Sequence, residues 1–278
     1  MKSGFTFPLI VLFLLSALSA VLVCCNSNES GVTPPVVEEN KNPPPPILGH
    51  TIVKVYPHDT SFYTQGLLFY QGELYEGTGD PGYRGKSRLM KVDLNTGKAL
   101  KSISLSDKYF GEGITILRDT IYQLTWQQNV VFVYTLKDFK KVKEYHLDGE
   151  GWGLTNDGQR LIISDGSGNL FYYTPSTFRL LSKSSIMEGN SETYNLNELE
   201  YIDGYVYANQ YELPYILKID PAAGKVVAKY DLNDMWKRAK SFNANVDVPN
   251  GIAYDSTTKK IYVTGKLWPE LYEIQLGQ

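Results

Sequence analysis

A glutamate flanked by two glycines is the residue of this chain best suited to acid–base chemistry. Glu112 lies between Gly111 and Gly113, directly ahead of an apolar run that is typical of a β-strand. Glycines favour turns, and a turn tolerates a glutamate. Alternatively, the glycines leave room for another group to approach the acid. A carboxylate in such a position can take a proton from one atom of a substrate and return it to another.

Residues of different chemistry occupy the position of Glu112 in other segments of the chain. Each stands just before an apolar strand: Gln65, Glu112, Trp152, Asn197 and Asn250. A second set follows on the next predicted strand: Gly79, Trp126, Gly166, Tyr211 and Lys266. A structural ring would repeat one residue type, whereas a binding site needs one scaffold with a different side chain at each position. We therefore predict that the two sets form a site together.

The elements that carry these residues are repeated strand pairs. An apolar strand, a polar turn and a second strand recur at 67–76, 114–123, 154–164, 199–208 and 252–263, and each pair precedes a further hairpin. Repeats of this kind predict an all-β fold, a five-bladed β-propeller with four antiparallel strands per blade. A β-sandwich would give more uniform strand spacing and no five-fold register. The only predicted helix is short, at 231–240.

The last unit lacks one strand, and the spare strand lies at the other end of the predicted domain, at 50–56. Pairing these two segments would close the ring and remove its exposed edges. We therefore predict that the N-terminal strand completes the last blade and that the propeller domain spans 49–278. The equivalent residues of the innermost strands would then converge at the mouth of a central channel.

The N-terminus predicts export. A short basic start and an apolar run from Phe5 to Val23 indicate a secretory signal, with a retained membrane anchor as the alternative. We predict a lipoprotein-type signal peptide over 1–24, a Pro- and Asn-rich linker over 25–48, and acylation of Cys24 or Cys25, with Cys25 favoured. The protein would then be lipid-anchored in a bacterial cell envelope, in the periplasm or at the cell surface. Mass spectrometry of the mature N-terminus tests this, and a chain starting at Met1 would overturn it.

Composition excludes several classes of site. Cys24 and Cys25 are the only cysteines, so the predicted domain has no thiolate nucleophile and no cysteine-ligated zinc. The net charge of −3 includes no basic block, so nucleic acid is not an expected partner. None of the three histidines falls in either set, which argues against a zinc enzyme. We interpret His58 as a structural turn residue rather than a base. Nothing indicates an oligomer, and we expect a monomer.

Motifs in every predicted blade resemble those of the plant-type glutaminyl-peptide cyclotransferases (glutamine cyclotransferases), which also occur in bacteria. They are YPHDT (56–60), YTQGL (63–67), FGEG (110–113), QLTW (123–126), GWGL (151–154), LNELE (196–200), NGIA (250–253) and TGKLWPELYE (264–273). The resemblance runs from about residue 50 to the end. It implies a five-bladed propeller enzyme that converts the N-terminal glutamine of peptides and proteins to pyroglutamate and releases ammonia.

Transferred onto this sequence, the family pattern makes Glu112 the catalytic acid and base. The positions that line the substrate pocket are Tyr63, Gln65, Phe110, Trp126, Trp152, Asn197 and Lys266. One position departs from the pattern, because Tyr211 stands where the plant enzymes have a second pocket tryptophan. The resemblance also implies a structural calcium ion in the channel, with Asn197, Asn250 and backbone carbonyl groups as candidate ligands. The chemistry itself requires no cofactor.

The reaction sets three requirements. The α-amine has a solution pKa near ~8, so part of it is protonated and cannot attack; an oxyanion needs donors; and the leaving nitrogen needs a proton. We expect Glu112 to move the protons, with its pKa raised by aromatic neighbours. We expect donors from the indole N–H groups of Trp126 or Trp152, from Asn197 and from Lys266. Gln65 would hold the substrate amine or amide.

Two other functions fit the same scaffold. A non-catalytic propeller would bind peptides or glycans, but it would have no need of an isolated acid among aromatic side chains. A metal-dependent lactonase or hydrolase would bring several acids to the channel. Glu112 is the only acid in the two sets, and Glu198 and Glu200 nearby are the remaining support for a metal enzyme.

Overall fold

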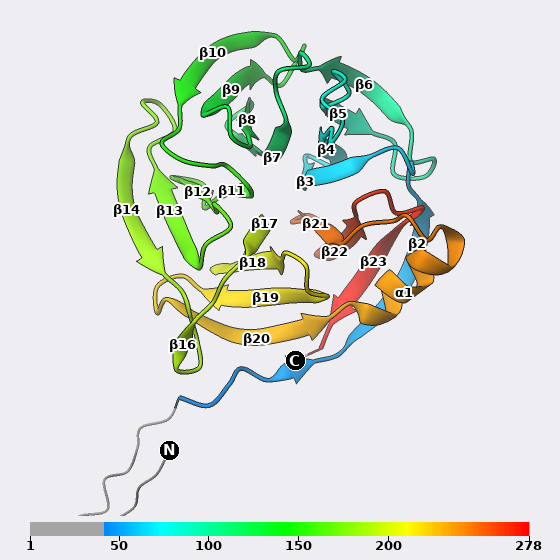
Figure 1. The fold of residues 1–278 in the computed structure, drawn as a ribbon, viewed down its shortest axis with the longest axis vertical. Coiled ribbons are helices and arrows are strands. Elements are labelled where there is room, and N and C mark those ends of the chain that lie inside the picture. Colours follow the sequence, from blue (N-terminus) through cyan, green and yellow to red (C-terminus); the bar gives the residue numbers. More distant parts are fainter. Residues whose placement is uncertain (1–41, 278) are drawn as a thin grey trace, which may run out of the picture. The chain divides into compact units, whose positions relative to one another are not determined.

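The structure is a computed structural model that describes residues 42–277. Figure 1 shows small sheets arranged around a common centre. The fold is all-β, with a β-propeller arrangement of antiparallel sheets. The predicted signal peptide and most of the predicted linker lie outside the described residues.

Four sheets have four strands each, in meander order. The first holds β3 (Tyr63–Tyr70), β4 (Glu73–Gly79), β5 (Arg88–Val92) and β6 (Ala99–Ser104). The second holds β7 (Gly111–Leu117), β8 (Thr120–Thr125), β9 (Val130–Thr135) and β10 (Lys141–His146). The third holds β11 (Leu154–Asn156), β12 (Leu161–Ile163), β13 (Asn169–Tyr173) and β14 (Leu180–Ser185). The last holds β21 (Pro249–Asp255), β22 (Lys260–Gly265), β23 (Glu270–Leu276) and β2 (His50–Pro57).

The remaining sheet has seven strands, which corrects the prediction of four strands in every blade. Its antiparallel part is β17 (Leu196–Ile202), β18 (Tyr205–Gln210), β19 (Tyr215–Asp220) and β20 (Lys225–Asp231). The outer strand β20 also pairs in parallel with β1 (Ile47–Leu48) and β15 (Met187–Glu188), and β15 pairs with β16 (Ser191–Glu192). The free edge of β20 is thus covered by short segments, a common way of protecting an edge strand. Residues 47–48, which the sequence placed in the linker, therefore belong to a sheet.

The predicted closure of the ring is confirmed. Strand β2 pairs with β23 in antiparallel register from His50 opposite Leu276 to Pro57 opposite Glu270. The innermost strands contact one another in the order β3, β7, β11, β17, β21 and back to β3. The sheets therefore form a closed circle within residues 42–277, with the inner strands nearest the axis.

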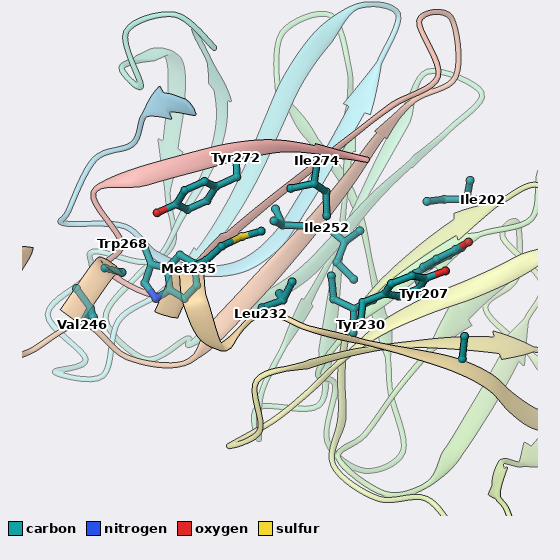
Figure 2. Packing of buried hydrophobic residues seen from close by; sticks show 14 residues of the cluster. Ile202, Tyr207, Tyr230, Leu232, Met235, Val246, Ile252, Trp268, Tyr272 and Ile274 are labelled. Carbon is teal, nitrogen blue, oxygen red and sulfur yellow. The ribbon is translucent and has the colours of Figure 1, made fainter. Parts of the chain in front are cut away.

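Burial follows strand position. Every residue of the inner strand β7 is buried, whereas the outer strand β10 is mostly exposed. Apolar clusters fill the spaces between neighbouring sheets. One of them lies between the seven-stranded sheet and the last sheet, where the helix α1 (Asn233–Phe242) inserts Met235 beside Trp268 (Figure 2). The predicted helix is thus confirmed, two residues further along the chain.

Candidate active site

Four of the five residues in the first predicted set lie at irregularities of the inner strands, and the fifth, Trp152, precedes β11. The register of β7 against β8 shifts between Gly111 and Ile114, which places Glu112 in a β-bulge. The inner strands β3, β17 and β21 shift in the same way around Gln65, Asn197 and Asn250. A bulge bends the strand and redirects a side chain. The inner strands can therefore point these residues away from the packed faces of the sheets.

The glycines beside Glu112 serve the approach of neighbouring backbone, not of a ligand. A Cβ on Gly113 would lie 2.6 Å from the Leu154 nitrogen, and the Gly113 N–H donates to the Trp152 carbonyl at 2.8 Å. A Cβ on Gly111 would lie 2.7 Å from the Thr78 carbonyl oxygen. Only glycine permits such contacts. The flanking glycines thus fix the distance between adjacent sheets, which corrects the interpretation that they clear space for an approaching group.

The structure brings all nine predicted site residues to one cavity of about 270 Å³. We call it the central cavity. It is lined by Tyr63, Gln65, Pro81, Tyr83, Phe110, Glu112, Trp126, Trp152, Asn197, Tyr211 and Lys266. Gly79 and Gly166 of the second set do not line it, and Asn250 lies behind Gln65.

Glu112 is a buried acid that makes no ion pair within 4 Å among residues 42–277. Its side chain is 4% exposed, and the Gln65 amide donates to its Oε1 at 3.2 Å. Burial raises the pKa of Glu112 well above its ordinary value, Lys266 opposes the shift, and the charge of Glu150 adds to it. A carboxyl group of this kind can exchange its proton near neutral pH.

Gln65 connects Glu112 to the next sheet. Its Oε1 accepts a hydrogen bond from the Asn250 amide at 3.1 Å, while its Nε2 donates to Glu112. Both ends of the side chain are therefore in use, and Gln65 orients the acid. The amide nitrogen has a second N–H, and the expected role of Gln65 in holding the substrate stays a prediction.

The two tryptophans do not direct their N–H groups at a reacting atom. Both indoles donate to the same oxygen, Oε2 of Glu150, at 2.7 Å from Trp126 and 2.9 Å from Trp152. The expectation that one of these indoles supplies an oxyanion donor is therefore not supported by the geometry. Glu150 instead holds the two rings as walls of the cavity.

Lys266 lies between two tyrosine rings. Its Nζ is 4.9 Å from the ring centre of Tyr63 and 5.0 Å from that of Tyr211, as in cation–π contacts. Among residues 42–277 it makes no ion pair within 4 Å. Burial lowers the pKa of Lys266, against the opposing charges of Glu112 and Asp247. Its side chain is 3% exposed, so the ammonium group faces the cavity rather than bulk water.

Known proteins are similar to this chain in sequence and in fold. Residues 18–276 match the family model described as glutamine cyclotransferase. The chain belongs to the glutamine cyclotransferase family. It is 40% identical over 230 residues to the glutaminyl-peptide cyclotransferase of Arabidopsis thaliana, covering 82% of this chain and 71% of that protein. The crystal structure of Myxococcus xanthus glutaminyl cyclase matches with a TM-score of 0.77 at 32% identity, over 84% of this chain and 98% of that one.

The family resemblance seen in the motifs is thus confirmed, and the position that departs from the plant pattern can be placed. Tyr211 lies against Trp152, with ring centres 5.5 Å apart and an interplanar angle of 85°. It therefore keeps an aromatic wall of the glutamine cyclotransferase cavity at this position.

Sequence reasoning missed four residues of this site. Pro81 and Tyr83 line the cavity from the loop between β4 and β5, and neither stands at a repeated position. Asp247 accepts a hydrogen bond from the Tyr63 hydroxyl at 2.6 Å, and Glu150 binds the indoles. Neither acid belongs to a repeated position. The spacing of Glu150, two residues before Trp152, was the only available signal.

His58 has a structural place. It is buried outside the central cavity, where its Nε2 lies 3.1 Å from Glu76 and its Nδ1 lies 2.8 Å from the Trp268 carbonyl oxygen.

In the described range, no group of three or more His, Cys, Asp or Glu residues is arranged to hold a metal ion. No helix within residues 42–277 has the length and apolar character needed to cross a membrane.

Proposed function

We propose that this protein is a glutaminyl-peptide cyclotransferase that converts the N-terminal glutamine of peptides and proteins to pyroglutamate, with release of ammonia. The observation that carries the proposal is the buried Glu112 carboxyl group, which faces an aromatic-walled cavity and has no ion-pair partner in the part of the chain that the structure describes. Membership of the glutamine cyclotransferase family and the names of both relatives support the same reaction.

In the proposed reaction the α-amine of the substrate attacks its own γ-carboxamide carbon. Glu112 accepts a proton from the amine as the new C–N bond forms and the carbonyl oxygen becomes an oxyanion. The same carboxyl then gives that proton to the amide nitrogen, so that ammonia leaves as the old C–N bond breaks and the carbonyl reforms. Protons and electron pairs balance with one residue as base and then as acid.

The donors for the oxyanion are Asn197 and Lys266, since Glu150 occupies both indole N–H groups. An ammonium group and an amide in a cavity shielded from water stabilise developing negative charge more strongly than they would in solution. The walls formed by Phe110, Trp126 and Trp152 hold the glutamine side chain folded toward its own amine, which supplies proximity.

We also propose that the seven-stranded sheet serves as the fifth blade, since its β17–β20 part repeats the meander of the other four. A structural calcium ion fits the axis of such a ring. The Oδ1 atoms of Asn197 and Asn250 are buried and have no hydrogen-bond partner among the described residues, and amide oxygens are suitable calcium ligands. When bound, the ion would supply rigidity only. An unchanged Tm on titration with calcium and EGTA would refute it.

The proposed reaction is tested by ammonia release from Gln-Ala-NH2 with the wild type and with Glu112→Gln. Because the amide cannot carry the proton, we expect kcat to fall by about 10²-fold or more. Glu144→Gln, on the exposed strand β10, is the matched control and should retain full activity. Wild-type protein that releases no ammonia would refute the function. An active, folded Glu112→Gln variant would refute only the role of Glu112.

A further inference from the structure

A second cavity, of about 530 Å³, adjoins the central cavity. The two cavities share Tyr63 and Pro81 as lining residues. The loop between β4 and β5 contributes to both: Pro81 and Tyr83 face the central cavity, whereas Arg84 and Lys86 line the second one. One loop therefore forms part of the wall of both cavities.

The second cavity is cationic. Arg84, Lys86 and Arg88 line it, and the only acid among its lining residues is Asp80. Among residues 42–277, Lys86 and Arg88 make no ion pair within 4 Å, and Arg84 pairs only with Asp80, at 3.6 Å with an exposed side chain. We call this space the cationic cavity.

The carboxylate of Asp80 accepts hydrogen bonds from backbone N–H groups of its own loop. Its Oδ2 accepts hydrogen bonds from the N–H groups of Arg84 at 2.6 Å and Lys86 at 3.0 Å, and its Oδ1 accepts one from Gly82 at 3.1 Å. These bonds lower the pKa of Asp80 despite its burial. Asp80 therefore shapes the loop, and Lys86 and Arg88 have no acidic partner within 4 Å among the residues that the structure describes.

We propose that the cationic cavity binds a carboxylate of the peptide substrate beyond its N-terminal glutamine. This inference rests on the proposed function, in which the N-terminal glutamine occupies the central cavity and the rest of the peptide leaves past its rim. The cavity that begins at Tyr63 and Pro81 offers cations to an Asp or Glu side chain near the N-terminus, or to the C-terminal carboxylate of a dipeptide. Arginine and lysine are suited to such groups.

The test compares kcat/KM for amidated peptides that differ in one charge. At low salt we expect Gln-Glu-Ala-NH2 or Gln-Ala-Glu-NH2 to exceed Gln-Ala-Ala-NH2 by about three- to tenfold, and Gln-Lys-Ala-NH2 to fall below it. Gln-Ala-OH against Gln-Ala-NH2 tests the terminal carboxylate as the source of the charge. The preference should shrink at 0.5 M salt because exposed charges are screened.

Two variants test the cavity: the single variant Lys86→Gln, and a double variant that adds Arg88→Gln. Both should lose the preference for acidic peptides while keeping turnover of Gln-Ala-Ala-NH2. Lys86 is exposed, so the single variant keeps the test valid if the change at the half-buried Arg88 impairs folding. Lys98→Gln, in the exposed turn at the opposite end of β5, is the matched control and should keep the preference.

If glutaminyl peptides are turned over without any charge preference, the proposal that the cationic cavity binds a substrate carboxylate is refuted, and the proposed function remains intact. If no glutaminyl peptide is turned over, the proposed function fails instead. Whether the cationic cavity binds a carboxylate is then tested by calorimetry with pyroglutamyl-Glu-Ala-NH2 as the ligand. Weaker binding to Lys86→Gln than to wild type supports it, and equal binding overturns it.

Discussion

The central cavity holds two buried ionisable groups, one acidic and one basic. Glu112 has a raised pKa and Lys266 a lowered one, because each loses water on burial. Glu150 adds a negative charge behind the indoles, and it increases the pKa of Glu112. The protonation state of Glu112 is therefore set by residues of several sheets, and changing one of them should move the pH dependence of the reaction.

Replacing Glu150 separates its charge from its hydrogen bonds. In Glu150→Gln the amide oxygen can still accept from both indoles, but the negative charge is lost. Because that charge raises the pKa of Glu112, we expect the acidic limb of the kcat/KM profile to move to lower pH. In Glu150→Ala the indoles also lose their acceptor, and we expect kcat/KM to fall about tenfold or more through misplaced walls.

The matched control for both variants is Asp148→Asn, in the same loop with a side chain that is 96% exposed. It should leave the pH profile unchanged. An acidic limb at the same pH in wild type and Glu150→Gln would show that the charge of Glu150 does not reach Glu112.

At the scale of elements, the inner strands are joined by acids of β17. Glu198 accepts hydrogen bonds from the N–H groups of Leu67 at 3.1 Å and Ile252 at 2.8 Å, and Glu200 accepts one from Tyr254 at 2.9 Å. The two acids thus connect β17 to β3 and β21 across the centre. Burial raises the pKa of Glu198 well above its ordinary value and that of Glu200 to about 8.

The raised pKa of Glu200 predicts a loss of stability with increasing pH. Below the ordinary pKa of a glutamate, folded and unfolded chains both hold the proton. Between that value and about 8 the unfolded chain releases it while the folded chain retains it, so the free energy of unfolding falls. Glu200→Gln keeps the acceptor for Tyr254 and cannot ionise. We expect it to be more stable than wild type at pH 8 by about 1 kcal/mol or more.

Urea unfolding of both proteins at pH 5 and pH 8 measures this difference. Glu192→Gln, with an exposed side chain, should follow the wild type at both pH values. A Glu200→Gln variant whose stability falls with pH as steeply as that of the wild type would contradict the prediction.

For the described part of the chain as a whole, closure of the ring joins β2 to the last sheet. Beside the β2–β23 pairing, His58 contacts Glu76 of β4 and the Trp268 carbonyl group. A carbonyl oxygen only accepts, so Nδ1 carries a hydrogen, and Nε2 faces a carboxylate, so it carries one as well. Although burial disfavours the charged form, Glu76 and Trp268 raise the pKa of His58. The buried pair is thus ionic.

Breaking that pair should weaken the closed ring. We expect His58→Gln to lower the free energy of unfolding by about 3 kcal/mol, since Glu76 would remain buried without its cation. The contribution of His58 is complete below the ordinary histidine pKa and is lost as pH rises through the raised value, so the difference from wild type should narrow in alkali. His146→Gln, whose side chain is 71% exposed, is the control. Equal denaturation midpoints for wild type and His58→Gln would refute the argument.

The sequence alone determined the strand repeats, the closure by the N-terminal strand and seven of the residues that line the central cavity, whereas Tyr63 and Phe110 came from the family resemblance. These follow from local signals, because alternating strands and turn residues recur and equivalent positions of a repeat must converge in a ring. The three extra strands of the seven-stranded sheet could not be predicted from such repeats. Its extra strands, β1, β15 and β16, are two residues long and carry no periodicity.

Only the tertiary structure decided what each side chain of the site contacts. The indoles of Trp126 and Trp152 donate to Glu150, Gln65 connects Asn250 to Glu112, and the glycines of FGEG admit neighbouring backbone. The physical reason is range. A hydrogen bond requires two atoms within about 3 Å, and the partners of Gln65 come from other sheets, up to 185 residues away in sequence. Residue types and spacing fix which side chains reach the axis, whereas the packing of the sheets fixes which atoms meet there.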